Sequence, residues 1–337
     1  MEIEKDKIKV EIKEAIVKTV AFFDMFDYPL TLFEIWQLVP TKCDLMDIIS
    51  GLTALKAVKP LVEEKDGFYF LAGRKEIIKI RLARYSLTDK KFKKAILITK
   101  IFKIIPWIKM IAVGNIIGSH NLARKGDIDL FIITENKKVW VTRFFCVLIS
   151  KFLGLRPKPG KTENKICLSF FISEEALSIK ELMLVKSMHY KQTLFKELEG
   201  YQALPEDNYF YHDIYFIYWL AGLVPIYDIS HIYKKFIYTN SWLEEFLPNW
   251  SANGLNYQRQ VKKGNSWFYR DVVDLLLGGL DSRLQEKQIK LMPKELLNIL
   301  NQDTRVVANE KIIKLHANDR REEYRDKYNK KIYEIFK

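Results

Sequence analysis

Apolar residues recur at helical spacing from Ile8 to Phe23, which predicts an amphipathic first helix. The Asp-Tyr-Pro sequence at 27–29 ends this pattern, and Thr31 stands where it can cap a second helix that runs to Gln37. A third helix is expected from about Asp44 to Ala57, with Asp44 as its N-cap. The first part of the chain is therefore predicted to hold three short helices.

Two short strands are predicted next, at 61–64 and 68–71, around the turn Lys65-Asp66-Gly67. Three helices followed by a hairpin is the order of a winged helix-turn-helix, so residues 1–73 are expected to form such a domain. The third helix, however, carries two acids and has no Arg or Lys before Lys56. Phosphate binding needs basic side chains, so a protein-contact or scaffold role is favoured over DNA binding.

The pattern of the middle of the chain predicts a long helix and then a mixed α/β unit. A basic helix is expected over about 74–105, ended by Pro106, and linking the two parts. Strands are predicted at 108–113, 128–134 and 166–172, with a helix at 139–155 between the last two.

Helical patterns broken by prolines and rich in aromatic residues fill the rest of the chain. This region is expected to be an all-helical domain that ends with a charged helix at about 319–337. The predicted fold class is α+β, with four parts: 1–73, a linker helix at 74–106, a core at 107–174 and a helical domain at 175–337.

Composition places the chain among ordinary globular proteins, with 48% apolar and 29% charged residues over 337 positions. Three cysteines without C-x-x-C spacing give no support for a disulfide framework or a cysteine zinc site, and they favour a reducing compartment such as the cytoplasm. The apolar stretches at 139–155 and 214–227 are too interrupted or too short to span a bilayer. They are expected to be buried helices, and no membrane association is predicted.

Positive charge is concentrated in one stretch. The chain carries a net charge of +13, and residues 74–109 hold twelve basic and two acidic side chains. A polyanion such as nucleic acid is one candidate partner for this stretch. A solvated helix face that keeps a basic protein in solution is the other interpretation.

Candidate chemistry lies between the first two strands of the core. The first strand leads into Gly118-Ser119, and the second begins with Asp127 and Asp129 on either side of Ile128. Carboxylates at i and i+2 of a strand face the same side, and their repulsion on an apolar strand is costly unless a cation neutralises it. Magnesium is the expected metal because it prefers carboxylate and phosphate oxygens.

Gly118 lets backbone N–H groups approach a phosphate closely, and the Ser119 hydroxyl adds a hydrogen bond. This ordered combination resembles the nucleotidyltransferase superfamily of the DNA polymerase β type, whose signature is an apolar-Gly-[Gly/Ser] strand end, a spacer and two aspartates in an apolar strand. The resemblance covers about 109–173, under a quarter of the chain. The order of winged helix, core and aromatic helical region also resembles bacterial nucleotidyltransferase-domain proteins.

The resemblance implies magnesium-dependent transfer of a nucleoside monophosphate from a nucleoside triphosphate, with ATP expected, to an acceptor hydroxyl on a protein, an RNA or a small molecule. Asp127 and Asp129 would hold metal, while Gly118 and Ser119 would bind phosphates. His120, Arg124 and Lys125 are further phosphate-binding candidates, although a helix cap and loop solvation explain them equally well. In the alternative interpretation there is no site: Gly118-Ser119 is an ordinary tight turn, and Asp127 is an ordinary residue at the start of a strand.

The superfamily usually adds a third carboxylate from a later strand, and here Ser169 stands at the expected position. The missing third carboxylate favours a rival hypothesis, in which the protein is a non-catalytic adaptor or regulator that senses a nucleotide. His189, His212, His231 and His316 lack metal-ligand spacing and are expected to be structural or exposed. The tryptophans of the C-terminal region are interpreted as core rather than as a platform for bases; they are Trp219, Trp242, Trp250 and Trp267.

Overall fold

A computed structural model describes residues 2–57, 60–114, 126–158, 160, 162–184, 213–252, 259–262 and 267–337. The protein is α+β, the class that its patterning predicted, and its helices surround one three-stranded and one six-stranded sheet. Within the described part of the chain, no helix has both the length and the apolar character to cross a bilayer.

The N-terminal part packs three helices on a small sheet with strand order β1-β3-β2. Thr31 begins the second helix with a capping box, because its hydroxyl accepts from the backbone N–H of Glu34 and the Glu34 side chain accepts from Thr31 N–H. Asp66 and Gly67 have positive φ angles of 56° and 77°, as a tight hairpin turn needs. The elements are α1 (Glu2–Asp24), β1 (Leu30–Thr31), α2 (Leu32–Leu38), α3 (Leu45–Ala57), β2 (Val62–Lys65) and β3 (Phe68–Leu71).

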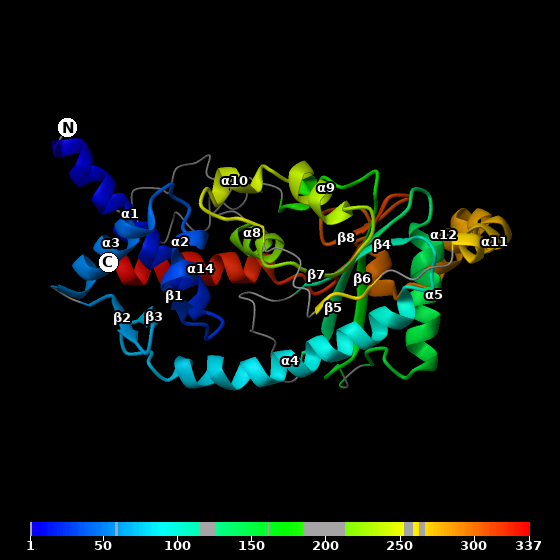
Figure 1. The fold of residues 1–337 in the computed structure, drawn as a ribbon, viewed down its shortest axis with the longest axis horizontal. Helices are drawn as coiled ribbons and strands as arrows, with labels where there is room; N and C mark the ends of the chain where they lie inside the picture. Colours follow the sequence, from blue (N-terminus) through cyan, green and yellow to red (C-terminus); the bar gives the residue numbers. More distant parts are fainter. Residues whose placement is uncertain are drawn as a thin grey trace.

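The predicted basic helix is α4 (Ile77–Phe102), which runs from the N-terminal part along the molecule to the large sheet (Figure 1). Several of its cations serve the fold. Arg81 is buried and donates to both carboxylate oxygens of Glu34, and Arg74 donates to Asp24 at 3.0 Å. The exposed basic residues of the helix and the segment before it are Lys75, Lys79, Lys90, Lys93 and Lys100.

The six-stranded sheet has the order β7-β4-β5-β6-β9-β8. β5 and β6 are parallel and are joined through α5 (Val139–Phe152), whereas every other neighbouring pair is antiparallel. The sequence predicted the three central strands closely. The strands are β4 (Ile108–Val113), β5 (Ile128–Thr134), β6 (Ile166–Ser173), β7 (Val224–Asp228), β8 (Val306–Ala308) and β9 (Ile312–Leu315).

The expectation of an all-helical region from 175 to 337 is wrong, because β7, β8 and β9 come from it and extend the sheet at both edges. The apolar run 214–227 divides into α8 (Ile214–Ala221) and β7 after Gly222. A short apolar strand and a buried helix share the same hydropathy, so periodicity could not separate them. Pro225 is tolerated because β7 is an edge strand.

Helices cover both faces of the large sheet. On one face, α4 and α5 pack against side chains that include Ile128 and Leu130. On the other, α8 and the last helix pack against side chains that include Phe131 and Ile133, together with the N-terminal helices. The remaining elements are η1 (Lys180–Leu182), α9 (Ile232–Thr239), α10 (Leu243–Phe246), α11 (Trp267–Leu277), η3 (Gly278–Leu280), α12 (Asp281–Lys290), α13 (Lys294–Leu297) and α14 (Arg321–Phe336).

Candidate functional site

The two aspartates of the predicted metal site lie at the start of β5, in the centre of the large sheet. Asp129 faces the side of the sheet that α8 and α14 cover, since it alternates with the oppositely directed Ile128 and Leu130. The backbone N–H of Gly114, just after β4, donates to the carbonyl of Asp129 at 2.9 Å. The end of β4 is therefore fixed beside the aspartates.

The phosphate-binding half of the prediction lies outside the described residues. Gly118, Ser119, His120, Arg124 and Lys125 all belong to the segment 115–125. Their predicted roles stay predictions.

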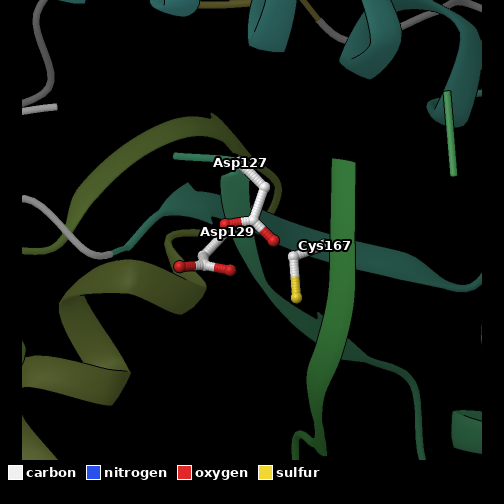
Figure 2. Close-up of side chains that lie close together, drawn as sticks. All are labelled: Asp127, Asp129 and Cys167. Atoms are coloured by element: carbon white, nitrogen blue, oxygen red, sulfur yellow. The ribbon is translucent and has the colours of Figure 1, made fainter. Parts of the chain in front are cut away.

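Asp127, Asp129 and Cys167 form a compact group on β5 and β6 (Figure 2). One carboxylate oxygen of each aspartate and the Cys167 sulfur all lie within 4.8 Å of one another. All three side chains are partly buried. Two oxygens and one sulfur at this spacing could coordinate a single cation.

Cys167 is the register partner of Asp129, whereas Ser169, which the sequence places at the third position, lies two residues further along β6 and lines the same pocket as Asp129. The register pairs Asp129 with Cys167 and then Phe131 with Phe170, so β6 has one extra residue over this interval. Ser169 lies in that irregular stretch and accepts a hydrogen bond from the Cys167 thiol at 3.2 Å. Because Cys167 and Ser169 share one face, the sequence could not show which of them the irregular register would place beside Asp129.

Burial dominates the electrostatics of this group. It raises the pKa of Asp127 above the ordinary value, although its hydrogen bonds and the charge of Lys91 oppose the shift. Burial, followed by the charges of Asp129 and Asp127, raises the pKa of the Cys167 thiol well above its usual range. The thiol is therefore protonated at neutral pH when no cation is bound.

Among the described residues, Lys91 is a cation near the aspartates that had not been singled out as an individual candidate. It is buried on α4, and its ammonium donates to the carbonyl of Gly126, next to Asp127. Burial lowers its pKa, while the nearby charges of Asp127, Glu163 and Asp129 oppose that shift. One residue of the predicted polyanion-binding stretch is thus directed at the site.

A pocket of about 190 Å³ adjoins Asp129 and extends toward α8 and α14. One wall is aromatic, since Trp219 stacks on both Phe170 and Phe216 with ring centroids 5.4 and 5.5 Å away. Trp242 is buried in the core, as predicted. Trp219 packs against the core too, but one edge of its ring lines this pocket. The aromatic wall offers an apolar surface next to a carboxylate.

The opposite wall of this pocket is polar and follows β9. His316 Nε2 lies 3.1 Å from the Ser169 hydroxyl, and burial, followed by the charge of Lys314, lowers its pKa to about 4. Lys314 donates to Asp319, and Arg321 bonds both Asp319 and Asp213. The sequence missed this wall because His316 lies 147 positions beyond Ser169. His189 and His212 lie outside the described residues.

Comparisons with models of protein families, with curated proteins and with solved structures find no match to this chain. The chemistry of the site must therefore be argued from its geometry.

Proposed function

We propose that the protein is a magnesium-dependent nucleotidyltransferase. It would move a nucleoside monophosphate from a nucleoside triphosphate to an acceptor hydroxyl, and ATP is the expected triphosphate. The observation that carries the proposal is the convergence of Asp127 and Asp129 beside the end of β4. The connection from β4 to antiparallel β5, and through α5 to parallel β6, supports a nucleotidyltransferase-like core at 107–174.

The donor atoms fit magnesium in part. Two carboxylate oxygens are ligands that magnesium prefers, and substrate phosphates and water would complete the six-coordinate shell. The Cys167 sulfur is a soft donor and would remain a neutral thiol outside that shell. When bound, the metal would neutralise charge on the triphosphate and lower the pKa of the acceptor hydroxyl.

The chain's own residues would bind and orient the substrate. Gly118 and Ser119 would contact the β- and γ-phosphates, with His120, Arg124 and Lys125 as further contacts. Lys91 would keep the carboxylates ionised, because its charge opposes the rise in the pKa of Asp127 that burial causes. No carboxylate occupies the third position, so the acceptor hydroxyl would depend on metal for activation.

The N-terminal part supports a winged-helix module over residues 1–73, with β1 completing the sheet of the hairpin. The exposed face of α3 carries Leu45, Met46 and Ile49 and no Arg or Lys up to Thr53. Such a face suits contact with a protein better than contact with DNA phosphates. Nucleic acid remains a candidate partner through the exposed lysines of α4.

One observation favours a second candidate function, a nucleotide-sensing adaptor without transfer activity. Neither Cys167, the register partner of Asp129, nor Ser169, at the position where the resemblance expects a third carboxylate, is an acid, and a protonated thiol is a poor base and a poor magnesium ligand. The two candidates share nucleotide binding and differ in turnover.

The test measures both properties on the full chain. Calorimetry of ATP binding with and without magnesium is compared for the wild type, Asp129→Asn and the matched control Asp66→Asn, which changes an exposed turn carboxylate. We expect magnesium-dependent binding to weaken at least tenfold in Asp129→Asn alone. Equal binding by all three proteins would refute the site. Incubation with each α-labelled triphosphate then separates transfer to protein or extract from binding without turnover.

A further inference from the structure

A second and larger cavity lies on the α5 side of β6. It measures about 550 Å³, within the usual range for sites that bind small molecules. Its walls are mainly apolar and include Phe144, Val147, Leu148, Leu291, Met292 and Leu296. Leu291, one of these lining residues, is 83% exposed. We call this cavity the α5 groove.

Two guanidinium groups, Arg143 and Arg156, enter the α5 groove, and no acidic residue is among its described lining residues. Within the described part of the chain, Arg143 donates to the neutral Gln288, and no carboxylate is among the charges that act on either arginine. The two positive charges repel each other. Burial lowers the pKa of Arg143 to about 10, and the nearby charge of Arg156 contributes to this shift. Two partly buried cations without a carboxylate are costly unless an anion joins them.

Arg143 is held in a fixed orientation. Its Nη1 donates to Gln288 at 2.6 Å, and the amide of Gln288 donates in turn to the carbonyl of Trp140 at 2.9 Å. Its Nε, in contrast, is buried and has no hydrogen-bond partner among the described residues. The Nε edge of a guanidinium matches the two oxygens of a carboxylate. Arg143 therefore holds a buried donor without a partner among the described residues, on a side chain that lines the groove.

We propose that the α5 groove binds a single-chain aliphatic carboxylate of the fatty-acid type. The carboxylate lies between Arg143 and Arg156, and the chain lies along the apolar walls toward Leu291 and Leu296. Lys151, exposed on the last turn of α5, adds a third positive charge at the rim. The apolar walls exclude a simple phosphate site, because they offer an inorganic anion no contact. The α5 groove also reaches Cys167 and Ser169, so it adjoins the candidate site, although the proposed binding of a carboxylate does not require nucleotide transfer.

The experiment titrates the full-length protein with decanoate and, separately, with decanol, decyl phosphate and inorganic phosphate. We expect decanoate to bind at least tenfold more tightly than decanol, which has the same chain and no charge, and inorganic phosphate not to compete. Binding of decanol as tight as that of decanoate, or stronger binding of decyl phosphate, would overturn the proposal.

Variants locate the site. Arg143→Met and Arg156→Met should each weaken decanoate binding at least tenfold, while Arg283→Met, an exposed arginine on α12, should leave it unchanged. Arg143→Lys keeps the charge but loses the Nε edge, so it should also weaken binding. If Arg143→Met fails to fold by circular dichroism, Arg156→Met and Arg143→Lys decide the result. Unchanged binding in both would refute the assignment.

Discussion

Asp129 and Cys167 are register partners on two parallel strands, so the residue beside the central carboxylate is a thiol. A thiol and a carboxylate differ in charge at neutral pH and in their preference for metals. This pair therefore decides which cations the site can hold and whether it contains a base. Replacing the thiol of Cys167 by a carboxylate tests this role.

Cys167→Asp should convert the site into a three-carboxylate magnesium site. Without metal, the added charge should lower the melting temperature, because three carboxylates would lie close together. Magnesium should then raise the melting temperature of the variant more than that of the wild type. If the protein is an enzyme, nucleotide transfer should be maintained or increased.

The control for this change is Ser169→Asp, at the position that the sequence alone had suggested. Ser169 contacts Cys167 and His316, and it is not the register partner of Asp129. The rise in melting temperature that magnesium causes should therefore be smaller in Ser169→Asp than in Cys167→Asp. Equal shifts in the two variants would contradict the importance of the register.

A second prediction concerns acid stability through His316. The folded-state pKa of His316 is lowered to about 4, mainly by burial, against an unfolded value of about 6.5. The unfolded chain therefore binds the proton first, so stability falls as pH decreases from about 6.5 toward 4. The loss from this residue is at most about 3 kcal/mol.

Urea unfolding of the wild type and His316→Gln at several pH values isolates this contribution. The difference in unfolding free energy between the two proteins should change between pH 7 and pH 4 in favour of the variant. A difference that stays constant over this range would show that His316 titrates normally in the folded protein.

A third prediction concerns the buried contact between α4 and the N-terminal part. Arg81 is buried and donates to Glu34, while Glu34 also accepts from the Tyr28 hydroxyl at 2.8 Å. Arg81→Met should cost about 3–5 kcal/mol, because it leaves a carboxylate without its partner. Arg81→Met combined with Glu34→Gln should cost less than the sum of the two single changes.

The matched comparison is the exposed pair of Lys93 and Asp89 on the same helix. Lys93→Met should cost less than about 1 kcal/mol, since exposed ion pairs contribute little. Chemical denaturation measures all of these variants. Similar costs for Arg81→Met and Lys93→Met would argue against the buried pair as a stabilising contact.

A fourth prediction tests α4 as a polyanion-binding surface. If its exposed lysines bind RNA or DNA, affinity should fall steeply with salt, because each neutralised phosphate releases a counterion. Replacing Lys75, Lys79 and Lys90 by Gln should reduce the slope of log affinity against log salt. Absence of binding at about 50 mM salt would leave these lysines as a solvated surface.

The sequence predicted the elements whose signals are local. Short apolar runs located β4 and β5, the Thr31 cap located α2, and Asp-Gly located the hairpin. It did not predict β7 or the pairing of β9 with β6, because these partners are distant in sequence, and it also missed the local hairpin of β8 and β9, since such short apolar runs resemble parts of a buried helix.

Within the site, the same limit applies. The aspartate pair was recognised from two residues on one strand, whereas its neighbour depended on an irregular register between two strands. The polar wall with His316 depended on β9, whose pairing with β6 no local pattern indicated. The residues of the site could be recognised by type, but their neighbours across the sheet depended on long-range strand pairing, which the sequence does not show.

That pairing also sets the order of events during synthesis. Ile172 on β6 pairs with Ile312 on β9, so the two residues leave the ribosome 140 positions apart. At about 5–20 residues per second, one edge of β6 would lack its partner for roughly 7 to 28 seconds. An unpaired strand edge invites pairing with another chain. The nascent protein therefore passes through an interval in which a chaperone covering β6 would determine how much of it folds.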